Sequence, residues 1–249
     1  MSESSGGVQS VERSYTLLEL IAEAGGEISL SKLAAASGLP LATVHRLART
    51  LAAGGYVRHL ASRRYALGPR LIQLGEASSR ILGSLGAPNL ARLADKTGES
   101  ANMAIFDRDG VVYVAQSPSR HSMRMFTEVG RRVEAHCTGV GKVLLAQMRP
   151  EVVRATVTRT GMPAHTRHTI TDPDALEAEL AKIRKQGYAV DNEEQEIGVR
   201  CIAVSVPGDS MTAISVSGPT GRVTLEAIEA ISRTLHEEAE LLARDLQAD

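Results

Sequence analysis

Residues 28–75 contain no aspartate or glutamate. The same stretch contains two short helical segments that are joined at a glycine. Ser29 can cap a helix that ends at Gly38, and the helix that follows it ends at Gly54. Two short helices joined by a glycine turn are typical of a helix-turn-helix. An amphipathic stretch that stops at Gly25 precedes them, so the sequence predicts a compact three-helix unit.

The same stretch is cationic, although the whole chain has a net charge of -1. Its charged residues are Lys32, Arg46, Arg49, Arg58, Arg63, Arg64 and Arg70. Binding to a phosphate backbone depends on such a local cluster of cations and not on total charge. The chain has no Trp and 3% aromatic residues, which leaves little material for stacking on single-stranded bases. Double-stranded DNA is therefore the nucleic acid that this composition favours.

The helix before Gly54 divides into an apolar face and a cationic face when its residues are placed about 100° apart. Its apolar residues, with helical spacing, are Val44, Leu47, Ala48 and Leu51. The opposite face has small residues for close approach to a major groove and arginines that can reach guanine edges or phosphates. The predicted DNA-binding residues of this helix are Ala42, Thr43, His45, Arg46, Arg49 and Thr50.

Residues 56–60 and 64–67 alternate like two strands around a short cationic turn, which predicts a hairpin. We interpret this hairpin as the wing of a winged helix-turn-helix. Its predicted phosphate contacts are Arg58, Arg63 and Arg64. The alternative interpretation is an ordinary three-helix packing unit whose arginines are merely solvated.

Residues 70–85 read as a connecting helix with an apolar stripe, interrupted by Gly75 and Gly83. The stripe consists of Leu71, Leu74, Ser78, Ile81 and Leu85. A second copy of the same helix would cover such a stripe most simply, so the pattern favours a dimer over packing on the same chain.

From Ala87 onward, strands and helices mix without strand-helix-strand repeats, which predicts an α+β domain around a mostly antiparallel sheet. A helix should start at Asp172-Pro173 and close at Gly187, and the last helix should span about residues 223–246. The predicted strands are residues 101–107, 111–116, 123–129, 188–192, 200–207 and 211–217.

No stretch approaches the roughly 18 apolar residues that would span a bilayer, and the polar N-terminus lacks the apolar core of a signal peptide. We therefore expect a soluble cytoplasmic protein without membrane contact. Cys137 and Cys201 are too few for a disulfide framework and form no Cys-x-x-Cys pair. Both are expected to be reduced.

Several short motifs, taken in order, resemble those of the isocitrate lyase regulator (IclR) family of bacterial transcription factors. They are Val8-Gln9-Ser10-Val11-Glu12-Arg13, Ser37-Gly38-Leu39-Pro40-x-x-Thr43-x-x-Arg46-Leu47, Tyr65-x-Leu67-Gly68, Gly141-Lys142, His168-Thr169-Ile170-Thr171, Gly187-Tyr188-Ala189-Val190-Asp191, Gly198-x-Arg200-Cys201-Ile202-Ala203 and Ser215-x-Ser217-Gly218-Pro219. The resemblance covers nearly the whole chain.

The resemblance implies a winged helix-turn-helix DNA-binding domain over residues 1–69, a linker helix over 70–86 and a GAF-like effector-binding domain over 87–249. It implies a transcriptional regulator, a repressor or an activator, that binds a double-stranded, palindromic operator as a homodimer or a dimer of dimers. It also implies a small metabolite as effector and no cofactor.

The effector site that the resemblance implies consists of Gly139, Val140, Asp191, Cys201, Ser215 and Ser217. Alternation along a strand would place the two serines on one face, and loop amides at a helix start would favour an anionic group. We therefore expect a small organic acid, such as a hydroxy, keto or ureido acid. The chain departs from the family at Glu134 and Ser205, where proline is frequent, and at Val143, where alanine is frequent.

The competing functional class is a cysteine-dependent enzyme acting on a small acid or ester. Its candidate groups are Cys137, Cys201, His136, His165, His168 and Asp191, which have no supporting short-range spacing. The segment around Gly139-x-Gly141-Lys142 does not match a phosphate-binding P-loop. His136 stands where that motif requires glycine, and Val143 stands where it requires serine or threonine. His165 and His168 lack a third ligand at a zinc-like spacing, so we expect no metal. A pure protein-interaction module would not need the cationic helix.

Overall fold

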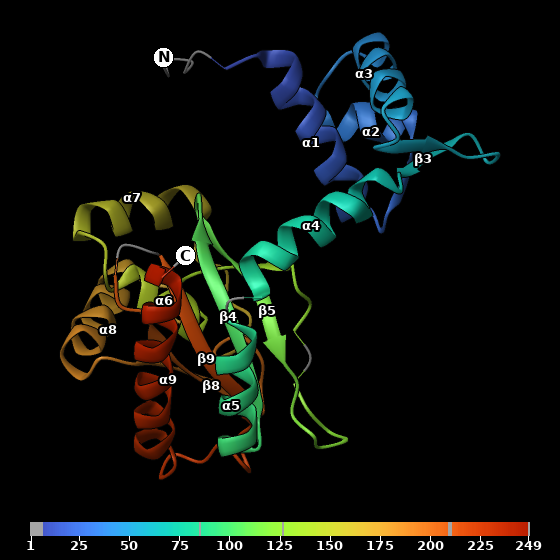
Figure 1. The fold of residues 1–249 in the computed structure, drawn as a ribbon. Coiled ribbons are helices and arrows are strands. Elements are labelled where there is room, and N and C mark those ends of the chain that lie inside the picture. The colour runs from blue at the N-terminus through green and yellow to red at the C-terminus, as the bar shows by residue number, and fades with distance from the viewer. Residues whose placement is uncertain (1–6, 85, 126, 209–210, 249) are drawn as a thin grey trace. The chain divides into compact units, whose positions relative to one another are not determined.

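The computed structural model describes residues 7–84, 86–125, 127–208 and 211–248, shown as a ribbon in Figure 1. The chain forms two compact units, and the division between them falls between Ser78 and Ser79. That division lies inside the stretch predicted to be a connecting helix.

The N-terminal unit contains three helices and a small sheet. Its elements are α1 (Gln9–Glu23), β1 (Glu27–Ser29), α2 (Leu30–Ser37), α3 (Leu41–Ala53), β2 (Val57–His59) and β3 (Arg64–Leu67). The three strands pair antiparallel in the order β1-β3-β2. The Ser29 hydroxyl caps α2 by accepting the Lys32 amide, and Gly38 ends α2 with a left-handed φ of 65°. The predicted helix-turn-helix and wing are both present, and β1 was not predicted.

The core of this unit gathers residues from all three helices and the sheet. Its fully buried members include Leu17, Ile21, Leu33, Val44 and Ala48. The predicted apolar face of α3 is therefore confirmed. An apolar stripe through Val11 and Tyr15 on α1 is not the buried face, because these side chains are 42% and 58% exposed.

Helix α4 (Arg70–Ser84) connects the two units in sequence. The predicted connecting helix is confirmed, and it continues through Gly75 and Gly83. A glycine inside a helix costs only about 1 kcal/mol, which the helical hydrogen bonds around it can offset. Of the predicted stripe, Leu74 is exposed, as is neighbouring Ile72. Leu85 and the side chain of Ile81 lie outside the described residues.

The C-terminal unit is built on one sheet. Its elements are α5 (Ala87–Thr97), β4 (Ser100–Asp107), β5 (Gly110–Ser117), β6 (Arg132–Val133), α6 (Gly139–Leu145), α7 (Pro150–Thr160), α8 (Pro173–Gln186), β7 (Ala189–Asn192), β8 (Val199–Ser205), β9 (Thr212–Pro219) and α9 (Ile228–Ala248). The strand order is β6-β5-β4-β9-β8-β7, and every pairing is antiparallel. The predicted α+β class is confirmed.

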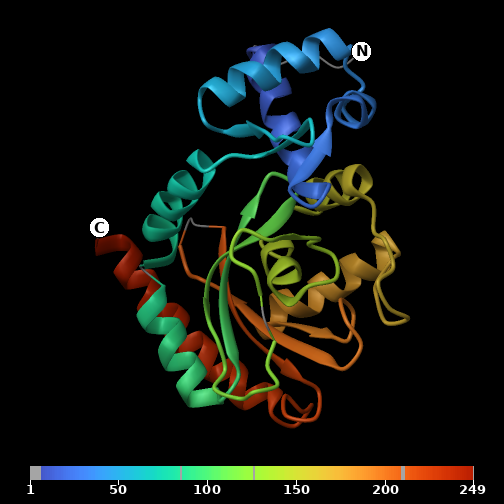
Figure 2. The same ribbon diagram turned by 90° about the vertical axis from the view of Figure 1, so that its right-hand side faces the viewer.

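Helices cover both faces of this sheet. Helices α5 and α9 lie side by side on one face, and α6, α7 and α8 cover the other (Figure 2). Alternate strand residues separate accordingly: Ile202 and Val204 pack toward α5 and α9, whereas Ala203 packs toward α6. The site described below lies on the α6 face.

Two predicted elements of this unit are wrong in extent. None of the described residues between 123 and 129 is in a strand, and the strand in this region is β6. Met123 there is 72% exposed, so its alternation with polar residues does not reflect burial. The last helix starts at Ile228 and not near Val223, because Arg222 and Val223 bond back to Pro219 in a turn.

Within the described part of the chain, we find no helix whose length and apolar character would suit a bilayer span.

Candidate functional site

The outward face of α3 carries the predicted DNA-contacting residues. Ala42, His45, Arg46, Arg49 and Thr50 are exposed. A shallow hollow runs along this face and is lined by His45, Arg46, Arg49, Thr50 and Ala53. Thr43 is half-buried, and the Thr50 hydroxyl donates to the Arg46 carbonyl at 3.1 Å. The face therefore offers two guanidinium groups one turn apart beside small side chains, a form that suits a major groove.

The three predicted arginines of the β2–β3 hairpin differ from one another. Arg58 and Arg63 are exposed, and Arg63 stands in the turn with a positive φ of 59°. Arg64 instead contacts Glu27 on β1, donating to its carbonyl at 2.9 Å and approaching its carboxylate at 3.3 Å. The sequence alone does not distinguish the three arginines, because β1 is too short to be recognised and its Glu27 carboxylate is what compensates the Arg64 charge.

The C-terminal unit holds a cavity of about 90 Å³ between the sheet and the start of α6. Its lining residues are Tyr113, Met125, Thr127, Arg131, Val133, Thr138, Gly139, Asp191, Gln195, Glu196, Val199, Cys201 and Ser217. Four residues of the predicted effector site are among them, namely Gly139, Asp191, Cys201 and Ser217.

Val140 and Ser215, the other two predicted effector residues, do not line this cavity. Val140 is a residue of α6, and its side chain is fully buried in the hydrophobic core. Ser215 is fully buried as well, and its hydroxyl has no hydrogen-bond partner among the described residues.

Strand register explains why the polar residues of the cavity meet. Asp191 on β7 pairs with Cys201 on β8, Cys201 pairs with Ser217 on β9, and Ser217 pairs with Ser100 on β4. Residues directly opposite one another in a sheet project to the same face. The pairing thus places an acid, a thiol and two hydroxyls in one row across four strands. Ser100, at the end of the row, does not line the cavity, and its hydroxyl donates to the Met125 carbonyl at 2.8 Å.

The start of α6 closes the cavity from above the sheet. The Thr138 hydroxyl caps the helix by accepting the Gly141 amide at 3.2 Å. A Cβ on Gly141 would overlap the backbone of Ala135, so only glycine permits this close approach. The tight turn sets Thr138 and Gly139 against the row on the sheet.

Burial raises the pKa of Asp191 to about 7. Its Oδ1 accepts the backbone amides of Glu194 at 2.8 Å and Gln195 at 3.4 Å, which partly offsets the effect of burial. Both amides use Oδ1, so Oδ2 is available to a bound molecule. Burial therefore favours the protonated form of the Asp191 carboxyl more than it would be favoured in a freely exposed side chain.

The two cysteines are poorly suited to nucleophilic chemistry. Burial raises the pKa of the Cys201 thiol to about 11, and it also raises the pKa of the Cys137 thiol. The Cys137 thiol donates to Gln195 Oε1 at 3.0 Å. A catalytic cysteine needs the opposite shift, toward the thiolate.

Sequence reasoning missed several residues that line the cavity, including Tyr113, Arg131 and Gln195. Arg131 is exposed. Among the described residues that line the cavity, it is the one with a positively charged side chain. Tyr113 comes from β5, Arg131 precedes β6, and Gln195 follows β7. No local motif joins them, because only the fold of the sheet brings these segments together.

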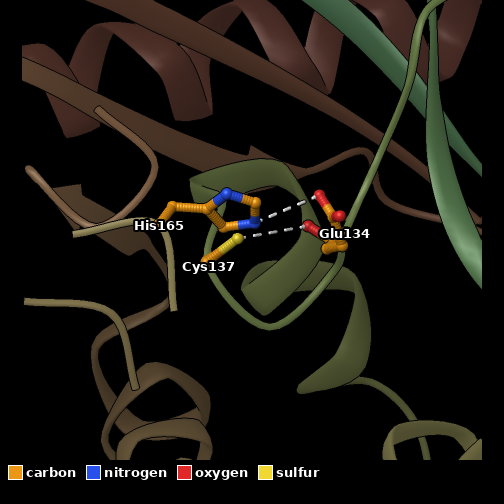
Figure 3. A group of neighbouring side chains, drawn as sticks. All are labelled: Glu134, Cys137 and His165. Carbon is orange, nitrogen blue, oxygen red and sulfur yellow. Dashed lines mark hydrogen bonds and ion pairs between the residues drawn. The ribbon is translucent and has the colours of Figure 1, made fainter. Parts of the chain in front are cut away.

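A second group of side chains lies beside the cavity, in the loops before α6 and after α7. Glu134, Cys137 and His165 converge there, and their potential ligand atoms all lie within 4.8 Å of one another (Figure 3). The His165 Nε2 atom is 3.6 Å from Glu134 Oε2. His168 does not join the group; its ring accepts from Arg167 Nε at 3.0 Å. The sequence does not reveal this convergence, because Glu134 and His165 are far apart in the chain, and its spacing predicts no metal ligand set at His165.

The sequence matches models of two protein domains. Residues 10–61 match the IclR helix-turn-helix domain, and residues 77–244 match the bacterial transcriptional regulator IclR C-terminal domain.

Similar proteins are named as regulators. The chain is 37% identical over 227 residues to the transcriptional repressor IclR of Escherichia coli, which covers 88% of this chain and 83% of the relative. It is 36% identical over 247 residues to the HTH-type transcriptional regulator BhcR of Paracoccus denitrificans, covering 97% and 88%. An IclR transcriptional regulator from Alicyclobacillus acidocaldarius has a similar structure, with a TM-score of 0.83, 27% identity, and coverage of 96% and 99%.

The two domain matches span most of the chain, and the fold contains the helix-turn-helix and the α+β domain that they describe. The chain therefore belongs to the IclR family of bacterial DNA-binding transcriptional regulators.

Proposed function

We propose that this regulator binds its operator through α3 and the β2–β3 wing, and that a small organic acid in the C-terminal cavity modulates this binding. The observation that carries the proposal is the polar lining of the cavity, where Asp191, Cys201 and Ser217 face Thr138 and Gly139. An apolar core would not place this set of groups around an open space, since unpaired polar groups cost free energy when buried.

The size of the cavity supports a ligand of a few carbons. A volume of about 90 Å³ corresponds to roughly six or more water-sized groups at about 10–15 Å³ each. A hydroxy, keto or ureido acid is of that size. A larger ligand would require the lining to move.

The charges of the lining support an acid that also carries a donor or acceptor. Arg131 supplies a cation that can pair with a carboxylate. Asp191 can donate a hydrogen bond when protonated or accept one when ionised, and Ser217 can do either. A carboxylate with a neighbouring hydroxyl, carbonyl or amide would use all three groups.

The proposed assembly is a homodimer or a dimer of dimers on a palindromic operator. The cationic face of α3 gives one half-site contact for each copy, and two copies related by a twofold axis would read a palindrome. Exposed Ile72 and Leu74 on α4 supply an apolar surface that a second copy could cover. We propose that the protein regulates transcription without enzymatic activity of its own.

The test uses the full chain in two assays. Isothermal titration with a panel of small hydroxy, keto and ureido acids should identify a ligand, with apolar aromatics of similar size as the comparison set. Fluorescence anisotropy with palindromic and scrambled duplexes should then show operator binding that changes when this ligand is added. Binding of the aromatics alone would reject the polar cavity. Equal affinity for both duplexes would reject specific DNA recognition.

A further inference from the structure

We propose that Glu134, Cys137 and His165 form a binding site for a zinc-like divalent cation in the C-terminal unit, separate from the row of residues that lines the cavity. Figure 3 shows the imidazole of His165 and the thiol of Cys137 directed toward Glu134. The three residues supply one nitrogen, one sulfur and one oxygen ligand. Nothing in the proposed DNA or effector binding uses them.

The spacing of the ligand atoms is close to what tetrahedral zinc requires. Zn–S bonds of about 2.3 Å and Zn–N or Zn–O bonds of about 2.0–2.2 Å place neighbouring ligand atoms about 3.3–3.7 Å apart. His165 Nε2 and Glu134 Oε2 are 3.6 Å apart, and all three ligand atoms lie within 4.8 Å of one another. A cation could therefore be bound after side-chain movements of about 1 Å, without a change in the fold.

The backbone around the three ligands is held by hydrogen bonds that do not use the ligand atoms. The Thr138 hydroxyl donates to the Glu134 carbonyl at 2.9 Å, which fixes the turn that carries Glu134 and Cys137. His136 Nε2 is 3.1 Å from the Pro163 carbonyl and joins this turn to the His165 loop. The His165 amide donates to the Thr169 hydroxyl at 3.0 Å. The two loops are thus pre-organised around the site.

The ligand set selects the class of metal. A thiolate and an imidazole favour zinc and chemically similar ions over magnesium and calcium, which prefer oxygen ligands alone. Binding would displace the Cys137 proton to solvent and replace the hydrogen bond from this thiol to Gln195. The resulting thiolate and the Glu134 carboxylate carry two negative charges, so a divalent ion would make the partly buried site neutral. This neutrality reduces the cost of placing the ion there.

The exposure of the three residues gives the ion an entry path and an open position. Cys137 is fully buried, whereas the side chains of Glu134 and His165 are 41% and 28% exposed. Three protein ligands leave the fourth tetrahedral position to water on the exposed side. The Cys137 thiol contacts Gln195, which lines the cavity, so the two sites are neighbours.

The experiment is a titration of the full chain, reduced and stripped of metal, with Co²⁺ as a spectroscopic probe. One equivalent should produce the sulfur-to-cobalt charge-transfer absorption and the visible bands of tetrahedral Co²⁺. Added Zn²⁺ should displace the cobalt and abolish both signals. The absence of these signals in the wild-type chain would overturn the proposal.

Matched variants locate the site. Cys137→Ser should remove the charge-transfer band, and His165→Gln and Glu134→Gln should each weaken cobalt binding by at least about tenfold. The control variants Cys201→Ser and His168→Gln change the other cysteine and a neighbouring histidine, and both should bind as the wild type does. Loss of the band in Cys201→Ser, or its persistence in Cys137→Ser, would place the metal elsewhere. His165 is on the exposed side, so His165→Gln tests the site even if Cys137→Ser does not fold.

Discussion

Lys142 on α6 and Glu194 in the loop after β7 form an ion pair whose side chains are only 1% and 8% exposed. The Lys142 ammonium also donates to the Val190 carbonyl at 2.7 Å, which ties α6 to β7. The second oxygen of Glu194, Oε2, is buried and has no hydrogen-bond partner among the described residues. This pair holds the helix that closes the cavity against the strand that carries Asp191.

Lys142→Met should lower the free energy of unfolding by about 3–5 kcal/mol, because it leaves the Glu194 charge buried and unpaired. Adding Glu194→Gln should restore a large part of that loss. Lys182→Met is the matched control, since Lys182 is 71% exposed where it pairs with the partly buried Glu179, and it should change stability by less than about 1 kcal/mol. Urea unfolding measures all four chains. A Lys142→Met protein as stable as the control would contradict the role given to the pair.

Arg46→Ala should weaken binding to the cognate operator by about 1–3 kcal/mol while affecting scrambled DNA little, if Arg46 contacts a guanine edge. Arg49→Ala should weaken binding to both duplexes alike, as expected for a phosphate contact. Arg149→Ala, an exposed arginine of the C-terminal unit, is the control and should bind as the wild type does. Anisotropy titrations at one fixed salt concentration compare the three. Wild-type affinity in both α3 variants would exclude this helix as the recognition element.

Arg58→Ala and Arg63→Ala should each reduce the slope of log affinity against log salt by about one unit, because each removes one phosphate contact. Arg64→Ala should reduce the slope by less, since Glu27 already compensates its charge in the free protein. Titrations across a salt series measure the slopes. An unchanged slope in all three variants would mean that the wing does not contact DNA.

Ser217→Ala should weaken the response to the effector by about 0.5–1.5 kcal/mol for a neutral hydrogen bond, and by up to about 3 kcal/mol for a bond to a charged group. Operator affinity without effector should stay nearly unchanged. Ser215→Ala is the matched control, because Ser215 points to the same face but does not line the cavity. Calorimetry with the identified acid compares the two variants. A larger loss of ligand affinity in Ser215→Ala than in Ser217→Ala would mean that the ligand contacts Ser215 and does not bind in this cavity.

Affinity for an anionic effector should fall as the pH rises through about 7, the pKa to which burial raises Asp191. Below this pH the carboxyl is protonated and can donate to the ligand, whereas above it the carboxylate repels an anion. The change should reach at most about tenfold per pH unit, because a single proton is involved. Asp191→Asn should flatten the profile. A wild-type profile that rises with pH would mean that Asp191 binds as an acceptor.

The sequence predicted the N-terminal unit well where one periodicity decided the structure. The buried residues Val44, Leu47 and Ala48 of α3 recur at helical spacing. The position of the exposed cationic face could therefore be predicted from the same pattern. Strand β1 was missed because three residues are too few to display alternation. The pairing of Arg64 with Glu27 depends on that strand and was missed with it.

The cavity could be predicted only in part, because residues far apart in the chain form it. Alternation placed Ser215 and Ser217 on one face, but it does not reveal which of them reaches the open space. Tyr113 and Arg131 have no sequence signal of their own, and the register of β5 and β6 brings them to the site. The convergence of Glu134 and Cys137 with His165 likewise depends on how two loops pack.

The cavity-lining row Asp191, Cys201 and Ser217 has a consequence for how the lining of the cavity can change by substitution. Each of the three stands on a separate strand: Cys201 and Ser217 lie on interior strands that pair on both sides, and Asp191 lies on the edge strand β7, which pairs with β8 alone. An exchange at one position therefore alters a single chemical group and leaves the others in place. The chemistry of the cavity wall can therefore change one side chain at a time, whereas a slip of one residue in any of the three strands would turn its member of the row away from the cavity, toward α5 and α9.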